Sequence, residues 1–327
     1  MLFATGVNHS LLVVVIASGV AYGTPLLYAS LGELLAERSG VLNLGVEGMM
    51  LVGAVMGFWC VQRFHVTGGV SLAAGLAVAA IAGAAMASIH AFLVITLRAS
   101  QIVSGLALTI FAGAVGLSSY LGNDLNLADQ PANHTFNPVF PASMRSWPVV
   151  GPILFGQDVL VYLSWALVVA LVWYLSRTRL GLNVRAVGES PAAADAMGIN
   201  VARYRYVHTI VGGALAGIAG ATFTLAITPQ WVNGITGGAG WIAIALVIFA
   251  FWRPELCLVG AYFFGALQAL APELQARNIS IGPTELWTNA LPYAATVVVL
   301  VFVSWRGAAR RLGAPAALGV SYVREEA

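Results

Sequence analysis

Nine long apolar runs dominate this sequence of 327 residues. They lie at about residues 9–32, 46–61, 69–97, 101–121, 157–176, 206–227, 239–252, 255–271 and 287–304. Hydrophobic residues make up 59% of the chain and charged residues 9%, which leaves too little polar material to cover a water-soluble domain. Because a helix of roughly 20 apolar residues crosses the core of a bilayer, these runs predict a polytopic membrane protein.

The runs predict helices, because none of them shows the alternation of polar and apolar residues that marks the strands of a membrane barrel. We expect an all-α fold of about nine transmembrane helices in a single domain over residues 1–327, since too little chain lies between the runs for a separate soluble domain. The runs at 239–252 and 255–271 are short, and Pro254 predicts a broken pair of helices there.

Arginine sets the orientation, because cytoplasmic loops are enriched in positive charge. With the N-terminus in the periplasm, only Arg63, Arg145 and Arg277 fall outside, and the loop at about 122–156 is periplasmic. The other twelve arginines then fall in the cytoplasm: Arg38, Arg98, Arg177, Arg179, Arg185, Arg203, Arg205, Arg253, Arg306, Arg310, Arg311 and Arg324. Residues 1–32 carry no charge and lack the basic start of a secretory signal, so we expect the first run to be retained.

The chain contains no lysine, which excludes a P-loop and a Schiff-base site. It also lacks the Gly-x-Ser-x-Gly pattern of hydrolases. His90 and His208 have no metal-ligand spacing with another His or Cys, and Cys60 and Cys257 lie in apolar runs. We therefore expect no enzymatic activity, no catalytic residue, no metal and no cofactor in this chain, and any ATP would bind to a partner.

Two glycine-containing helix starts resemble each other. Gly45-Val46-Glu47-Gly48 follows the irregular polar stretch 33–43, and Gly237-Gly238-Ala239-Gly240 follows the irregular stretch 228–236. In the predicted orientation the first enters from the cytoplasm and the second from the periplasm. This is the pattern of an inverted repeat whose discontinuous helices meet at a central site.

Polar residues near the first helix start are candidates for the pathway of a transporter. A carboxylate in a bilayer is costly unless it is paired or faces a cavity, so we assign Asn43 and Glu47 to the pathway. Glu47 has the alternative role of capping the exposed backbone N–H groups at the start of its own helix. Glu33, Glu37 and Arg38 form either a solvated cytoplasmic turn or part of the pathway.

Six weaker pathway candidates follow, each with a structural alternative. Polar residues of the fourth run can hydrogen-bond a solute or a neighbouring helix. Tryptophans beside the second irregular stretch suit a ring-shaped solute, although tryptophans near span ends commonly anchor a helix at the membrane interface. The six are Gln101, Ser104, Thr109, Trp231, Asn233 and Trp241.

A cytoplasmic loop at 177–205 is the expected contact for a partner protein. Ser190 and Pro191 make a good N-cap and first residue for a short helix over 191–197, and Gly198 ends it. A helix this short is stable only when it docks on something. The loop carries five arginines as well as Glu189 and Asp195, which favours a partner over packing on its own bundle alone.

Three motifs resemble the permease subunits of ABC importers: Gly40-Val41-Leu42-Asn43-Leu44-Gly45-Val46-Glu47-Gly48-Met49-Met50, Gln101-Ile102-Val103-Ser104-Gly105-Leu106-Ala107-Leu108 and Gly181-Leu182-Asn183-Val184-Arg185-Ala186-Val187-Gly188-Glu189. The branch is the one shared by branched-chain amino acid, ribose-type and nucleoside permeases, and the first motif looks most like its nucleoside members. The resemblance implies a type II importer fold with two inverted four-helix repeats at about 9–121 and 206–304. A connecting helix at 157–176 and a coupling loop at 177–205 join them, and 305–327 is a cytoplasmic tail.

The resemblance also implies a function and partners. We expect the translocation pathway of an ATP-driven importer for nucleosides or related purine and pyrimidine compounds, in the inner membrane of a bacterial cell. The expected partners are an ABC ATPase that binds ATP and Mg²⁺, a second related permease in a heterodimer rather than a homodimer, an extracytoplasmic solute-binding protein and membrane lipid, without nucleic acid.

The implied ATPase contact lies in the coupling loop. Ala193-Ala194-Asp195-Ala196-Met197-Gly198 matches the core of the importer coupling motif, but Ala192 stands where the motif has a leading glutamate. This leaves open whether Glu189 or Arg185 makes the polar contact. The coupling candidates are Arg185, Glu189, Ser190, Pro191, Ala193, Ala194, Asp195 and Gly198.

Other functions remain open from the sequence alone. A permease for a simple sugar or a branched-chain amino acid would have the same architecture. An ion-coupled secondary transporter would use Glu47 or Glu33 as a titrating group. A membrane enzyme or scaffold is a further class, although no pair of nucleophile and base in the sequence favours it.

Overall fold

The computed structural model describes residues 10–64, 67–128, 130–278, 290–291, 293–298, 301 and 313–323. Regular structure within these residues is helical, apart from isolated backbone bridges. The helices are α1 (Leu11–Arg38), α2 (Val46–Arg63), α3 (Gly68–Ala91), α4 (Gln101–Ala112), α5 (Leu117–Asp124), α6 (Ala142–Arg145), α7 (Val159–Arg177), α8 (Arg179–Glu189), α9 (Pro191–Ala196), α10 (Val201–Thr222), α11 (Ala239–Phe249) and α12 (Pro254–Ala276). Wider π-helical turns extend α3 through Phe92–Thr96 and α10 through Phe223–Ile227, and a third covers Gly151–Phe155.

Six stretches of helix in the described residues are long and apolar enough to cross a membrane: Leu11–Arg38, Gly68–Thr96, Gln101–Asp124, Val159–Arg177, Val201–Ile227 and Pro254–Ala276. Helices α2 and α11 are the shorter apolar elements between them, and α11 has only 11 residues. The chain is therefore a multi-pass membrane protein. Nine complete spans are not described, because only half of the run predicted at 287–304 belongs to the described residues. Of this run, 290–291, 293–298 and 301 are described and are helical.

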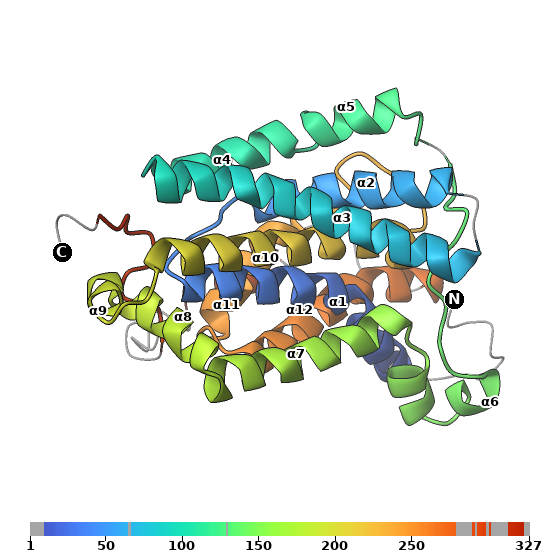
Figure 1. Ribbon diagram of the computed structural model, residues 1–327. Helices are drawn as coiled ribbons and strands as arrows, with labels where there is room; N and C mark the ends of the chain where they lie inside the picture. The colour runs from blue at the N-terminus through green and yellow to red at the C-terminus, as the bar shows by residue number, and fades with distance from the viewer. Residues whose placement is uncertain are drawn as a thin grey trace.

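Helices α1 and α10 form the centre of the bundle (Figure 1). Helix α1 contacts α7, α10, α11 and α12, whereas α10 contacts α1, α2 and α3. Helices α4 and α5 lie on the outer side of α2 and α3, and they carry exposed large hydrophobic side chains such as Ile110 and Tyr120. Apolar side chains on an outer face suit contact with lipid rather than with water.

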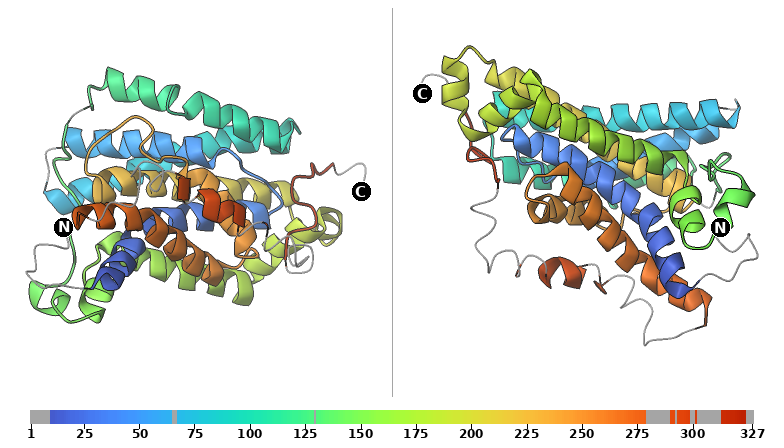
Figure 2. Two further views of the ribbon diagram at one scale, coloured as in Figure 1. Left: turned by 180° about the vertical axis from the view of Figure 1, so that it is seen from behind. Right: turned by 90° about the horizontal axis from the view of Figure 1, so that it is seen from below.

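The bundle has two ends that differ in content (Figures 1 and 2). We call them the α9 end, where α8 and α9 lie beside residues 39–45, 250–253 and 313–323, and the α6 end, where α6 lies. The α9 end holds Arg38, Arg98, Arg177, Arg179, Arg185, Arg203, Arg205 and Arg253, and the α6 end holds Arg63, Arg145 and Arg277. The remaining four arginines lie outside the described residues. The uneven distribution gives the molecule a basic end.

Small residues let the central helices touch backbone to backbone. A Cβ atom built on Gly53 of α2 would lie 2.4 Å from the backbone of Gly217 in α10, and one built on Gly217 would lie 2.1 Å from the Ala79 carbonyl oxygen in α3. Close backbone approach of this kind maximises van der Waals packing where lipid removes the hydrophobic driving force between helices.

The first helix is longer than predicted. Helix α1 continues to Arg38, so the irregular stretch covers 39–45 and not 33–43, and we call residues 39–45 the 39–45 turn. Glu33 and Glu37 are each only 1% exposed, so the interpretation as a solvated turn is wrong. The carboxylates find buried donors: the Asn43 N–H donates to Glu33 over 2.9 Å, and the indole of Trp252 donates to Glu37.

Three further elements differ from the predicted pattern. The fourth run is not one helix, because the chain breaks between α4 and α5 at residues 113–116, which begin and end with glycine. The predicted loop at 177–205 is mostly helical, with α8 over 179–189. Pro254 separates α11 from α12 and stands at the first position of α12, as predicted for a broken pair.

We expect Gly217→Ala to destabilise the folded protein by roughly 1–3 kcal/mol, because the new methyl group would overlap the backbone of α3. Gly69→Ala is the matched control, since nothing lies within 4 Å of a Cβ atom at Gly69, in the first turn of α3. Thermal unfolding of the two purified variants in detergent measures the difference. Equal unfolding midpoints would contradict the backbone contact between α10 and α3.

Candidate functional site

Glu47 links the starts of the two interrupted helices. It is the second residue of α2 and is 8% exposed. One carboxylate oxygen accepts hydrogen bonds from the Thr236 hydroxyl at 2.6 Å and the Gly238 N–H at 2.9 Å. The other oxygen accepts the Gly240 N–H at 2.7 Å. The carboxylate therefore caps α11, whose N-cap is Gly238, rather than its own helix.

The electrostatics of this contact are favourable from both sides. A carboxylate is stabilised near the N-terminus of a helix, where unpaired N–H groups and the helix dipole concentrate positive charge. Glu47 lies in the first turn of α2 and simultaneously at the N-terminus of α11. One negative charge thus holds together two helix starts that would otherwise present positive ends to each other. We call Glu47, Thr236, Gly238 and Gly240 the Glu47 contact.

Glycine is required where the two helices meet. Gly238 has a φ of +82°, in the left-handed region that side chains disfavour. A Cβ atom on Gly240 would lie 2.5 Å from the Glu47 backbone nitrogen, so α2 and α11 approach too closely for any side chain there. The glycine pattern at 237–240 therefore reflects a real helix junction, although Thr236 was not among the predicted site residues.

Helix α4 holds the 39–45 turn through its polar side chains. Gln101 accepts the Leu42 N–H at 2.6 Å, and the Thr109 hydroxyl donates to the Leu44 carbonyl at 2.8 Å. Irregular backbone within a membrane must find such internal partners, because lipid offers none. The alternative we gave to solute contact was a bond to a neighbouring helix, whereas Gln101 and Thr109 bind the irregular backbone of the 39–45 turn.

His90 supports the same turn and was missed as a site residue. One ring nitrogen lies 3.1 Å from the Leu42 carbonyl oxygen and the other lies 3.0 Å from the Ser104 hydroxyl. Asn43 folds back within the turn, where its side-chain oxygen accepts the Gly45 N–H at 3.0 Å. Asn43, Ser104 and His90 are all buried, so they shape the backbone that leads into α2.

Trp231 and Asn233 lie apart from the Glu47 contact, against helix α5. Trp231 is 4% exposed and packs against Gly122 of α5, and the Asn233 amide donates to the Ser119 hydroxyl of the same helix. Trp241, in the first turn of α11, is 36% exposed. The structure therefore divides the eight predicted pathway residues between the 39–45 turn, the junction with α11 and the outer helix α5.

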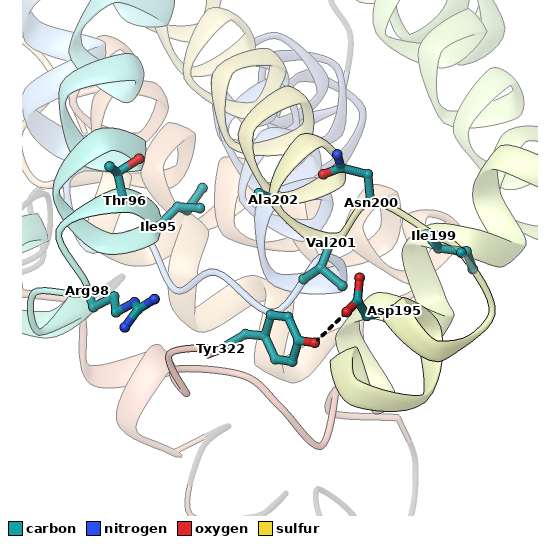
Figure 3. A pocket seen from close by; sticks show the side chains of 10 residues that line it. Ile95, Thr96, Arg98, Asp195, Ile199, Asn200, Val201, Ala202 and Tyr322 are labelled. Atoms are coloured by element: carbon teal, nitrogen blue, oxygen red, sulfur yellow. Dashed lines mark hydrogen bonds between the residues drawn. The ribbon is translucent and has the colours of Figure 1, made fainter. Parts of the chain in front are cut away.

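The coupling candidates gather at the α9 end. Helix α9 covers 191–196, capped by the Ser190 hydroxyl, and Gly198 with a φ of +81° ends it, so the predicted short helix is confirmed. Beside it lies a cavity of about 410 Å³ between the end of α3 and the start of α10, lined among others by Arg98, Asp195 and Tyr322 (Figure 3). Tyr322 donates a hydrogen bond to Asp195 across the edge of this cavity.

No group of three His, Cys, Asp or Glu side chains that could bind a metal occurs in the described part of the chain. Cys60 and Cys257 are both buried free cysteines within helices α2 and α12. The polar chemistry of the bundle includes hydrogen bonds from side chains to interrupted backbone and the buried carboxylates of Glu33, Glu37 and Glu47.

Residues 15–302 match the family model described as branched-chain amino acid transport system / permease component. The chain is 42% identical to a putative glucose ABC transporter permease protein of Haloferax volcanii, over 94% of this chain and 96% of that protein. It is 34% identical to a nucleoside ABC transporter permease protein of Lactococcus lactis, over 96% and 98%. It is 32% identical to a guanosine ABC transporter permease protein of Bacillus subtilis, again over 96% and 98%.

A second guanosine permease protein of Bacillus subtilis is also similar, at 28% identity over 75% of this chain and 71% of that protein. The same species thus has two different permease proteins with the same named solute, and both resemble this chain.

We expect Glu47→Gln to destabilise the protein by about 1.5–3 kcal/mol, because the amide replaces one acceptor oxygen with a donor that faces a backbone N–H. Thr236→Val removes only one neutral donor and should cost about 1 kcal/mol. Tyr120→Phe on the exposed side of α5 is the control. Thermal unfolding in detergent ranks the three. A Glu47→Gln protein with wild-type stability and no transport would place the charge in solute transfer instead.

Proposed function

The chain belongs to the branched-chain amino acid transport system permease family, and from this premise we propose that it forms the translocation pathway of an ATP-driven importer. The Glu47 contact carries this proposal, since it joins two interrupted helices in the interior of a membrane bundle. Half-helices that meet inside the bilayer are the usual construction of a transport site. ATP and Mg²⁺ would bind to a separate ATPase, so the chain itself would catalyse no reaction.

The eight pathway candidates divide into two roles in this proposal. The buried ones, Asn43, Glu47, Gln101, Ser104 and Trp231, fix the backbone around the pathway. Thr109 acts with them through the Leu44 carbonyl. Asn233 and Trp241 have exposed surface and supply the contacts with solute. A pathway with so few free polar groups would bind its solute weakly, which suits a system in which a solute-binding protein supplies the specificity.

We propose two inverted repeats, one at about 9–121 and the other at about 206–304. What supports this is the pairing of equivalent parts: α1 and α10 are neighbouring central helices, and each is followed by an irregular stretch and an apolar helix that starts at the Glu47 contact. Helix α7 then connects the repeats, and α8 and α9 form the coupling loop.

The solute class we propose is nucleosides and related purine and pyrimidine compounds. Two full-length relatives carry a nucleoside and a guanosine in their names, at 34% and 32% identity. A second candidate is a simple sugar, because the relative at 42% identity is named a putative glucose permease. A nucleoside contains both a sugar and a ring that can stack on an indole such as that of Trp241.

The partners follow from the two ends of the bundle. The basic α9 end faces the cytoplasm by the positive-inside rule, which puts α9 where an ATPase can reach it and residue 10 at the periplasmic side of an inner membrane. A solute-binding protein would dock at the α6 end. The two guanosine permease proteins of Bacillus subtilis support a heterodimer with a second, related permease.

We expect the purified chain alone to transport nothing into proteoliposomes, whereas the complex with its second permease, ATPase and solute-binding protein imports labelled guanosine when ATP is present. Excess unlabelled uridine should compete, and excess glucose should not. Uptake by the chain alone, driven by an ion gradient, would support a secondary transporter. Competition by glucose but not by uridine would assign the sugar as solute.

The turn after α9 provides a direct test of coupling. Gly198→Val should reduce ATP-driven uptake strongly, because a β-branched residue is strained at a φ of +81°. Gly198→Asn is the matched control, since asparagine tolerates this conformation and nothing lies within 4 Å of a Cβ atom here. Uptake and ATP hydrolysis are measured in proteoliposomes. Normal uptake in the valine variant would remove this turn from the coupling mechanism.

A further inference from the structure

Residues 313–323 cross the α9 end of the bundle as a strap with a turn at 316–319, and we call them the 313–323 segment (Figure 2). On one side the segment binds α8 and α9: the Ala316 N–H donates to Glu189, the Ala317 N–H donates to the Gly188 carbonyl at 2.9 Å, and Tyr322 donates to Asp195 at 3.1 Å. These contacts hold two of the coupling candidates, Glu189 and Asp195.

On its other side the same segment binds the start of the pathway. The Gly319 N–H donates to the Gly40 carbonyl at 3.3 Å. Arg38, the last residue of α1, donates to the Gly313 carbonyl at 3.2 Å and to the Trp252 carbonyl at 2.8 Å. The segment thus reaches the 39–45 turn, and this turn leads directly into α2 and Glu47.

Helix α9 has little other support. Ala194 is its only buried residue, and it packs in a small cluster with Val187 and Val201. Tyr322 packs against the same cluster, and its hydroxyl points toward Asp195 of α9 (Figure 3). Helix α9 contacts α8 and the start of α10, and α8 packs against Arg38 at Gly188. The 313–323 segment adds a hydrogen-bonded connection from α9 to the 39–45 turn.

Arg205 of α10 lies beneath the segment. It is 2% exposed, and one of its terminal nitrogens donates to the Val320 carbonyl at 3.0 Å. Its two other nitrogens have no hydrogen-bond partner in the described part of the chain. A buried guanidinium with unpaired donors is costly, because the segment that covers it keeps water away from its charge. This cost favours a segment that can also lift and leave Arg205 hydrated.

From these contacts we propose that the 313–323 segment transmits the movement of α9 to the 39–45 turn, with Tyr322 and Arg205 as its positioning residues. This inference rests on the proposed function. When an ATPase displaces α9, the Tyr322–Asp195 bond pulls the segment, and the Gly319–Gly40 and Arg205–Val320 bonds pass the displacement to the turn before α2. Transmission by this route needs two packed arrangements of the segment, of which the structure shows the closed one.

Two variants and a control test the proposal in the complete transporter, reconstituted with ATPase, second permease and solute-binding protein. Tyr322→Phe removes only the hydroxyl that binds Asp195. Gly319→Val strains a φ of +78° where nothing lies within 4 Å of a Cβ atom. Val320→Ala changes an exposed side chain of the same segment and leaves the carbonyl that Arg205 binds.

The measured quantity is the ratio of solute imported to ATP hydrolysed, together with co-purification of the ATPase. We expect Tyr322→Phe and Gly319→Val to lower this ratio on the order of two- to tenfold, with the ATPase still bound. Val320→Ala should match the wild type. A purely structural role would instead reduce uptake and hydrolysis in proportion.

The outcomes separate this proposal from the proposed function. If the wild-type complex shows no ATP-driven uptake, the proposed function fails. If the wild type imports and both variants keep its ratio, or lose uptake and hydrolysis in proportion, the transmission role of the segment is overturned while the importer assignment stands.

Discussion

A single carboxylate joins the starts of two helices that lie far apart in the sequence. Glu47 lies in the first turn of α2, and its side chain accepts hydrogen bonds from Gly238 and Gly240 at the start of α11. The two helices can approach closely at this contact because Gly240 has no side chain. A Cβ atom there would collide with the Glu47 backbone. A positive charge in place of Glu47 would face two helix N-termini and push the halves apart.

The lipid environment explains the other polar residues of the interior. In the 39–45 turn, the first three N–H groups donate to carbonyls at the end of α1. The Leu42 N–H and the Leu44 carbonyl instead bind the side chains of Gln101 and Thr109 in α4. Such irregular backbone is stable in a membrane only when protein surrounds it. The polar side chains of α4 therefore fix the backbone that leads into α2. At the α9 end, the 313–323 segment binds the 39–45 turn, Arg205 and α9.

The sequence predicted the parts of this fold that depend on composition and local pattern. Apolar runs located most of the helices, and the Ser190, Pro191 and Gly198 pattern located α9. The break between α4 and α5 was missed because its residues, Gly113 to Gly116, are as apolar as the helices around them.

Long-range partners were beyond the sequence. Capping of its own helix by Glu47 was an open alternative, but the donors that Glu47 binds, Thr236 and Gly238, lie about 190 residues further along the chain, just before α11. In the same way, nothing local shows that Glu33 and Glu37 are buried, because their donors belong to the 39–45 turn and to Trp252. Hydrogen–deuterium exchange of peptides covering residues 234–242, in the assembled transporter, tests the junction most directly. The account predicts slow exchange of the Gly238 and Gly240 amides, and exchange as fast as that of an unstructured peptide with the same sequence would contradict it.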